Sequence, residues 1–331
     1  MPVPHKIFEK VLYMKTYPQV HKLIAAQQHG FVRGRTIETN LLEFTHYLTK
    51  TLDKYHQTQM DVVYTDFQKA FDKVNHQILL RKLHRMGFSS SAVKLFKDYL
   101  QQYRQYVNYR GTKSHVYKCI TGVPQGGNLA SLLFLIYVND IPGYLKHTRL
   151  LLFADDLKIF KEIDTIRGTE DLKTNIRALE QWSEENRLPL NAKKCKIITF
   201  TRMRNPINVE YEIHEEKLER VNKIRDLGVL MEKKLNYANH VHSVITKAKR
   251  TAGLIRRHSR AFRKMDTLRL LFITLARTHL EFASIIWNSK SKSKTEIDAI
   301  ELVQKKFLKF LYYEDFLYYD HNITYSELTA G

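Results

Sequence analysis

Cysteine is scarce in this chain: 331 residues contain only Cys119 and Cys195. The two form no CxxC pair and have no nearby histidine at ligand spacing, so neither a zinc site nor a disulfide framework is indicated, and a reducing intracellular compartment fits. Glycine and proline are also sparse, and no low-complexity linker separates the subdomains. No apolar run is long enough to span a membrane, and no amino-terminal signal peptide is recognisable.

Basic residues are abundant. Lysine and arginine number 54 against 34 acids, which gives a formal net charge of +20 and a pI of about 9.7. So large an excess points to a polyanionic partner, with nucleic acid as the first candidate. A basic surface that serves only solubility is the alternative.

Two adjacent acids, Asp155 and Asp156, join two short apolar runs within residues 150–160. The pattern predicts a β-hairpin with the carboxylates at its tip. Neighbouring carboxylates repel each other, so a bound cation such as Mg²⁺ would stabilise them. A solvated turn is the alternative, because aspartate is common in turns.

A third acid, Asp66, ends a second β-prone run at residues 61–66. Apolar residues then keep helical spacing through residues 67–87, with Gly87 as the expected stop. If the two strands are neighbours in one sheet, Asp66 and the hairpin tip meet at one edge. Three carboxylates there can hold two metal ions, as polymerases do.

Three segments then carry a family resemblance. Residues 64–72 resemble motif A of reverse transcriptases, residues 121–129 motif B, and residues 153–156 motif C. Their order and spacing are similar to those of non-LTR retrotransposons, especially the jockey-like insect elements, and the similarity continues downstream. It implies an α+β right-hand polymerase fold with partial fingers (1–60), a palm with an antiparallel sheet flanked by helices (61–205, with an insertion around 88–118), a primer-grip hairpin (206–235) and a helical thumb (236–331).

The resemblance implies an RNA-directed DNA polymerase with a two-metal mechanism. Asp66, Asp155, Asp156 and the Phe67 carbonyl would hold two Mg²⁺ ions, with Mn²⁺ as a substitute. Phe71 would exclude ribose by clashing with its 2′-hydroxyl, although the residue also fits an apolar helix face. The motif B turn would hold the nucleotide, and the family usually has serine at its last glycine; the residues concerned are Gln125, Gly126 and Gly127.

Further segments resemble later family motifs. Residues 186–200 resemble motif D, whose lysine approaches the leaving pyrophosphate; Lys194 is the expected residue, with Lys193 and Lys196 left open. Leu227 and Gly228 lie in a stretch similar to motif E, which grips the primer, between β-prone runs at residues 209–213 and 229–231. Nucleic-acid phosphates are the expected partners of several cations: Arg33, Arg35, Lys247, Arg250, Arg256 and Arg257.

Other segments are read from pattern alone. The tyrosine-rich run at residues 103–109 could stack on bases, but an ordinary sheet is preferred. The carboxy-terminal third is expected to be helical, with one helix over residues 277–287 and another capped by Thr295.

The implied partners are an RNA template, a DNA primer, deoxynucleoside triphosphates and, as a candidate, a separate endonuclease, without a membrane. The nucleus and a cytoplasmic ribonucleoprotein both fit. The fingers strands and the endonuclease domain that precede this region in relatives are not in the sequence, which suggests amino-terminal truncation. A catalytically inactive, nucleic-acid-binding remnant is therefore the rival hypothesis.

Overall fold

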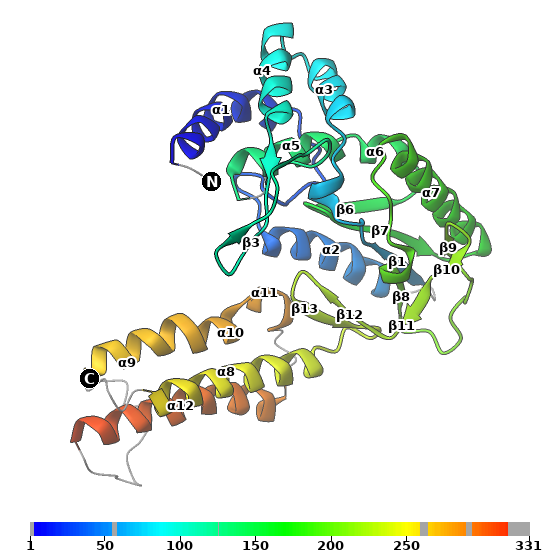
Figure 1. Ribbon diagram of the computed structural model, residues 1–331. Coiled ribbons are helices and arrows are strands. Elements are labelled where there is room, and N and C mark those ends of the chain that lie inside the picture. Colours follow the sequence, from blue (N-terminus) through cyan, green and yellow to red (C-terminus); the bar gives the residue numbers. More distant parts are fainter. Residues whose placement is uncertain (1–2, 55–57, 125, 259–263, 289–292, 317–331) are drawn as a thin grey trace. The chain divides into compact units, whose positions relative to one another are not determined.

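The computed structural model describes residues 3–54, 58–124, 126–258, 264–288 and 293–316 (Figure 1). The chain divides into two compact units, Met1–Asn222 and Lys223–Gly331. In the described ranges, no helix is both long and apolar enough to cross a membrane.

The first unit is built on a five-stranded sheet in the order β11-β8-β1-β7-β6. All neighbouring strands are antiparallel except β11, which runs parallel to β8. The expected antiparallel sheet is therefore confirmed. Its strands are β1 (Gln59–Thr65), β6 (Arg149–Phe153), β7 (Asp156–Ile163), β8 (Lys196–Thr201) and β11 (Glu219–Val221).

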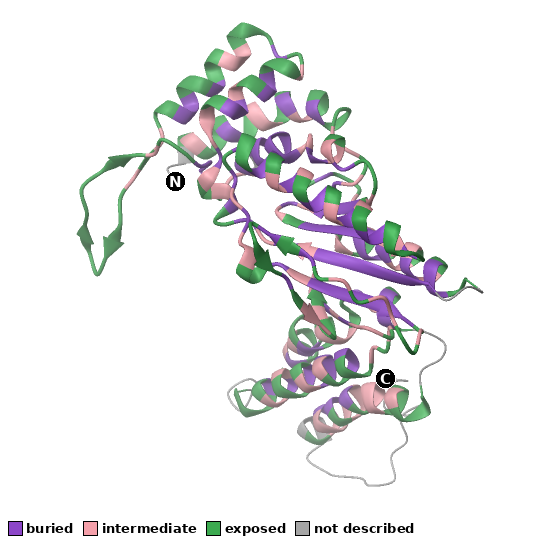
Figure 2. Ribbon diagram, turned by 90° about the vertical axis from the view of Figure 1, so that its right-hand side faces the viewer, coloured by how far each residue is buried: buried purple, intermediate pink, exposed green. Residues whose placement is uncertain are grey.

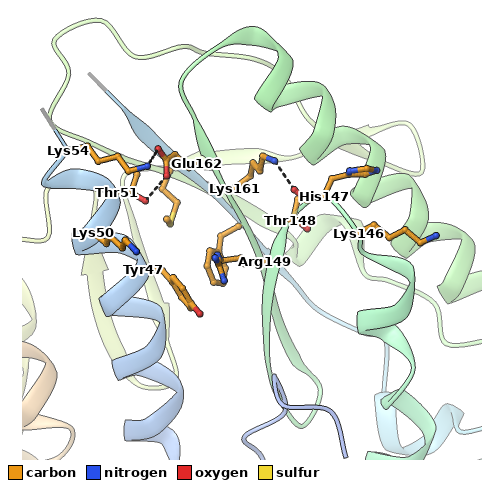
Figure 3. Close-up of a pocket in the computed structure, with 12 residues that line it drawn as sticks. Tyr47, Lys50, Thr51, Lys54, Lys146, His147, Thr148, Arg149, Lys161 and Glu162 are labelled. Atoms are coloured by element: carbon orange, nitrogen blue, oxygen red, sulfur yellow. Dashed lines mark hydrogen bonds and ion pairs between the residues drawn. The ribbon is translucent and has the colours of Figure 1, made fainter. Parts of the chain in front are cut away.

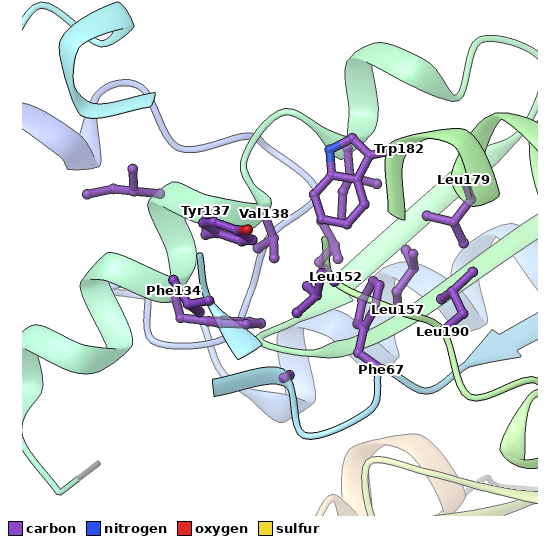
Figure 4. Packing of buried hydrophobic residues seen from close by; sticks show 14 of the residues in the cluster. Phe67, Phe134, Tyr137, Val138, Leu152, Leu157, Leu179, Trp182 and Leu190 are labelled. Carbon is purple, nitrogen blue, oxygen red and sulfur yellow. The ribbon is translucent and has the colours of Figure 1, made fainter. Parts of the chain in front are cut away.

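Both faces of this sheet are covered, because apolar side chains alternate between them along each strand. On one face, Phe44 of α2 (Ile37–Leu52) contacts Phe160 and Phe200, with ring centroids 5.3 and 6.1 Å apart. The opposite face packs against α5 (Asn128–Val138) and α7 (Ile166–Glu185) in one continuous core (Figure 4). One face of α7 is buried against the sheet, and it carries the following residues: Leu172, Ile176, Leu179 and Trp182.

The helix expected over residues 67–87 is interrupted, so that prediction is wrong in detail. A 3₁₀ turn (Ala70–Lys73) comes first, and α3 (His76–Arg85) begins only after Asn75, whose side chain accepts hydrogen bonds from the backbone of Gln77 and Ile78. An asparagine N-cap starts a new helix rather than continuing an old one. Three further helices complete the unit: α1 (Val3–His21), α4 (Ser90–Gln101) and α6 (Ile141–Tyr144).

The tyrosine-rich run forms strands, as expected, but in two two-stranded sheets outside the five-stranded one. It forms a two-stranded ribbon that projects from the unit and is exposed along its length (Figure 2). Tyr109, near the tip of the ribbon, is 67% exposed. The ribbon pairs β2 (Arg104–Gln105) with β5 (Tyr117–Lys118) and β3 (Asn108–Tyr109) with β4 (Thr112–Lys113). A separate hairpin pairs β9 (Glu212–Ile213) with β10 (Glu216–Lys217).

The second unit begins with a hairpin of β12 (Lys223–Asp226) and β13 (Val229–Glu232). The partner of residues 229–231 is therefore β12; the other β-prone run, residues 209–213, ends in β9 of the first unit. The long helix α8 (Ala238–His258) follows the hairpin.

Two helix predictions in this unit need correction. The helix expected over residues 277–287 is broken at Ala283, which has a left-handed φ of 49°. Ser293, not Thr295, caps the last helix, because the Ser293 hydroxyl accepts from the Glu296 backbone N–H. The remaining elements are α9 (Met265–Leu271), a π-helical segment (Phe272–Arg277), α10 (Thr278–Glu281), α11 (Ser284–Trp287) and α12 (Lys294–Phe316).

Candidate active site at the strand ends

Strand pairing brings the three predicted acids to one end of the sheet. β1 pairs with β7 in a register that places Thr65 opposite Leu157. Asp66 follows Thr65, and Asp156 precedes Leu157, so these two acids lie at the same strand ends. Asp155 sits in the two-residue turn between β6 and β7, where Ala154 takes a positive φ of 56°. The predicted hairpin with acids at its tip is confirmed.

The surroundings of Asp155 disfavour its negative charge. Burial raises the pKa of Asp155 above its usual value, and the negative charge of Asp66 raises it further, whereas the backbone N–H of Asp155 acts in the opposite direction. Both effects disfavour the ionised carboxylate, and a cation between the two acids would reverse them. Asp156, the first residue of β7, is exposed.

Asp66 is held by two residues that sequence reasoning did not single out. Asn191 donates from its backbone N–H to the Asp66 carbonyl (2.7 Å) and from Nδ2 to Oδ2 (3.2 Å). The Asp66 N–H in turn donates to the Cys195 Sγ across 3.4 Å. Burial raises the pKa of this thiol to about 11, so it stays protonated near neutrality. Asn191 follows an apolar Leu-Pro-Leu run, but nothing in the sequence pairs it with Asp66.

The structure separates the three candidate lysines of motif D. Lys194 Nζ lies 3.7 Å from Asp66 Oδ2, whereas Lys196 pairs with Glu219 at 2.9 Å. Lys193 is exposed. Of the three, Lys194 alone lines the pocket beside Asp66, which is formed by Asp66, Phe67, Gln68, Lys69, Lys73, Asn191 and Lys194.

The hairpin tip is supported by a loop that runs beside β6. The Gln28 side-chain Oε1 accepts from the backbone N–H of Ala154 (3.0 Å) and of Gly30 (2.8 Å). A Cβ on Gly30 would lie 2.3 Å from the Ala154 nitrogen, so only glycine allows this approach. Gln28 was also missed by sequence reasoning.

The two arginines after this loop differ in their surroundings. Arg35 donates through Nη1 to the carbonyls of Ala25 and Ala26 (3.0 Å each) and to that of Gln28, so it stabilises the loop that supports the tip. The Arg33 side chain is exposed, and its backbone N–H donates to the Tyr17 hydroxyl. The predicted phosphate contacts of both arginines stay predictions.

The two motif A phenylalanines lie on different sides of the strand end. Phe67 is 5% exposed and packs edge-on against Trp182, with centroids 6.0 Å apart. Phe71 is half-buried and stacks on Phe134 at 4.4 Å, with Phe31 approaching its edge. Phe71 is therefore anchored in the core on one side without being enclosed by it.

The motif B loop packs against motif A. The Gly122 N–H donates to the Val74 carbonyl, and Gly122 has a φ of +86° with the Asp72 backbone against its Cα. Gln125 lies outside the described residues. Gly126 is exposed, with a φ of +100°.

Gly127 has a neighbour that explains its lack of a side chain. A Cβ there would lie 1.8 Å from Glu9 Oε2. Glu9 is 2% exposed and accepts a hydrogen bond from the Tyr99 hydroxyl at 2.5 Å. The carboxylate from α1 thus occupies the space that a serine side chain at position 127 would need.

In the second unit, Leu227 and Gly228 form the β12–β13 turn, both with positive φ. A Cβ on Gly228 would lie 2.9 Å from the Phe282 ring. The four predicted α8 cations are all exposed: Lys247, Arg250, Arg256 and Arg257. Arg256 also lies over the Phe310 ring, 5.0 Å from its centroid.

The side chains at the strand ends suit a hard divalent cation. Asp66 and Asp155 supply carboxylate oxygens, the ligand type that Mg²⁺ prefers. Burial, and to a smaller extent the charge of Asp66, raise the pKa of Asp155, and such a cation would offset both effects. Within the described ranges, no group of three or more His, Cys, Asp or Glu side chains is already arranged as a metal cage. A site of two carboxylates with water and phosphate oxygens completing the shell agrees with both observations.

The family match and the similar curated proteins agree with each other. The family described as "Reverse transcriptase (RNA-dependent DNA polymerase)" matches residues 1–266. The RNA-directed DNA polymerase from mobile element jockey of Drosophila funebris is 24% identical over 324 residues, covering 93% of this chain and 34% of that protein. The probable RNA-directed DNA polymerase from transposon X-element of Drosophila melanogaster is 23% identical, covering 94% and 35%.

The chain thus spans about a third of the length of these curated relatives. Among solved structures, the apo telomerase of Candida tropicalis aligns with 92% of this chain and 55% of its own, at 11% identity and a TM-score of 0.48.

Proposed function

Because this chain belongs to the reverse transcriptase family, we propose that it adds deoxynucleotides to a primer 3′-hydroxyl under the direction of an RNA template. The observation that carries the proposal is the meeting of Asp66 and Asp155 at one end of the sheet, close enough for one charge to shift the pKa of the other. Lys194 lies beside Asp66.

In the proposed site, Asp66 and Asp155 would hold two Mg²⁺ ions, with help from Asp156 and the Phe67 carbonyl. When bound, the ions lower the pKa of the primer hydroxyl and neutralise charge on the triphosphate. Asn191 fixes the Asp66 carboxylate through its 3.2 Å hydrogen bond.

Lys194 has a separate role in this proposal. Its ammonium group is exposed in the pocket beside Asp66. There it can neutralise the leaving pyrophosphate or donate a proton to it. Lys196 is a weaker candidate, because Glu219 already engages it.

Nucleotide selection would fall to Phe71. Its ring is fixed by stacking on Phe134, yet half-exposed at the strand end. A fixed ring excludes a 2′-hydroxyl more sharply than a mobile one, because it cannot move aside. Gln125 and Gly126 would contact the nucleotide from the motif B loop.

The two units divide the remaining work. We assign the palm and the elements of the fingers to the first unit, and the thumb and the primer-grip turn at Leu227–Gly228 to the second. The exposed α8 cations would bind backbone phosphates. Arg33 and Arg35, a separate endonuclease, and residence in the nucleus or a cytoplasmic ribonucleoprotein stay predictions.

The rival is an inactive remnant that only binds nucleic acid, and primer extension separates the two. An oligo(dT) primer on poly(rA) with Mg²⁺ is offered to the chain and to an Asp155→Asn, Asp156→Asn double variant. Extension by the unaltered chain alone supports the polymerase. No extension by either, with salt-sensitive binding retained by both, supports the remnant.

A further inference from the structure

A second pocket lies in the first unit, at the end of the sheet opposite the acids (Figure 3). It encloses about 550 Å³, a volume typical of ligand sites. Its walls come from the carboxy-terminal end of α2, the start of β6 and the end of β7. Because β7 carries about five residues between the two ends, the pocket lies roughly 15–20 Å from the carboxylates.

The pocket carries more positive charge than its acids neutralise. Lys54 pairs with Glu162 at 2.5 Å, and Lys161 pairs with Asp171 at 2.9 Å. Three other lining cations have no ion pair within the described part of the chain: Lys50, Lys146 and Arg149. Unpaired like charges around one hollow favour an anionic occupant.

One of these cations is held in a defined plane. The Arg149 guanidinium stacks over the Tyr47 ring, 4.2 Å from its centroid, and Tyr47 leans on Phe160 (Figure 3). Tyr47 therefore supports the Arg149 guanidinium from one side, and the Arg149 side chain is exposed. A planar guanidinium of this kind can stack on a nucleobase and donate to phosphate.

A hydroxyl adds to the polar lining. Thr148 lines the same pocket, and its buried Oγ1 has no hydrogen-bond partner among the described residues. A side-chain rotation would let it donate to an oxygen atom of an occupant.

We propose that this pocket binds one nucleotide of a single-stranded nucleic acid, with its phosphate on Lys50 and Lys146 and its base on Arg149. A duplex is a convex rod that cannot enter such a hollow, whereas an unpaired nucleotide can. An acidic peptide would satisfy the lysines but leave the stacked Arg149 plane unused. The pocket lies away from the catalytic end of the sheet, so binding of a single-stranded nucleic acid there does not depend on polymerase activity.

Binding of a fluorescent 12-nucleotide oligouridylate tests the proposal, measured by anisotropy across a KCl series. The variant is Lys50→Ala, Arg149→Ala. The matched control is Lys94→Ala, Lys97→Ala, which removes two exposed lysines of α4. Losing the Lys50 phosphate contact should reduce the salt slope by about 0.7, and losing the Arg149 base contact as well should weaken binding about fivefold or more. The control should change little, and thermal melting confirms that both variants are folded.

A photo-crosslinking arm localises the contact. The same oligonucleotide with 4-thiouridine should label the peptide that contains Tyr47, and the double variant should lose that label. A parallel series with oligodeoxyuridylate shows whether RNA or DNA depends more on the pocket. Equal affinity and slope in the double variant and the control, or no labelling near Tyr47, would overturn the proposal. So would displacement of the RNA by polyglutamate more readily than by oligouridylate.

Discussion

Asn191 binds both the backbone and the side chain of Asp66: its backbone N–H donates to the Asp66 carbonyl at 2.7 Å, and its Nδ2 donates to the carboxylate at 3.2 Å. This pair fixes the direction of the carboxylate from a loop 125 residues away in sequence. We expect Asn191→Ala to lower kcat about 10–100-fold, as loss of an orienting hydrogen bond does at ligand carboxylates. KM for the nucleotide should change less. Single-nucleotide incorporation measures both.

The matched control for this change is Asn205→Ala, which alters an exposed asparagine of the same unit. It should leave kcat within about twofold. If Asn191→Ala behaved like Asn205→Ala, the orienting role of Asn191 would be wrong.

Lys194 and Lys196 provide a second comparison. We expect Lys194→Ala to lower kcat about tenfold or more, because the ammonium group beside the leaving pyrophosphate is lost. Lys196→Ala removes the same charge from a lysine that pairs with Glu219, and it should have little effect on kcat. Rapid-quench incorporation with both variants tests this, and equal losses would contradict the assignment of Lys194.

Gly30 tests the support of the hairpin tip. Gly30→Ala would put a Cβ 2.3 Å from the Ala154 backbone nitrogen, and backbone cannot easily move aside. We expect it to cost about 1–3 kcal/mol in the free energy of unfolding and to displace Asp155. Gly143→Ala is the control, because its Cβ would meet open space. Urea unfolding of the two variants gives the comparison, and similar midpoints would refute the close approach.

Asp155 gives a prediction about pH and metal. Because its folded pKa lies above its usual value of 3.8, its contribution to stability is full below that value and is lost as pH rises through the folded pKa. With a chelator present, Asp155→Asn should therefore match the unaltered chain in acid and melt higher at pH 7, by about 1–3 °C.

Added Mg²⁺ should reverse this order. Binding to the folded state raises the melting temperature of the unaltered chain, whereas the variant lacks a ligand. Melting curves at pH 4 to 7, with chelator and with Mg²⁺, measure both effects. A variant that melts lower than the unaltered chain at pH 7 in chelator would contradict the raised pKa of Asp155.

Glu9 and Gly127 should be coupled energetically. Gly127→Ser restores the usual family residue but collides with the buried Glu9 carboxylate, so we expect destabilisation of about 1–3 kcal/mol. In a Glu9→Ala background the same change should cost less, because the space is free. A double-mutant cycle by urea unfolding measures the difference. Additive effects would show that Glu9 does not explain the glycine.

Sequence patterns found the acids because each lies next to a strong local signal. Asp155 and Asp156 separate two apolar runs, and Asp66 ends a third, so strand periodicity alone placed them at strand ends. The same local logic located the exposed cations of α8. The sequence alone does not show that β1 and β7 are neighbours in one sheet; the structure shows that they pair.

What the sequence could not supply were contacts between distant loops. Gln28 contacts Ala154, and Asn191 contacts Asp66, only in the folded sheet. The residues next to a polar side chain in a loop do not indicate which distant residue it will bind. The predictions of two continuous helices were wrong for a related reason. Apolar spacing continues across Asn75 and Ala283, while the backbone turns there.

The most direct test of the central claim is single-deoxynucleotide incorporation on one RNA-templated DNA primer across a Mg²⁺ titration. The unaltered chain, Asp66→Asn and Asp155→Asn are compared, with primer–template binding measured on the same samples. The account predicts Mg²⁺-dependent incorporation by the unaltered chain and its loss in both variants, with binding retained in all three. Incorporation that survives either substitution, or that is absent from the unaltered chain despite binding, would contradict it.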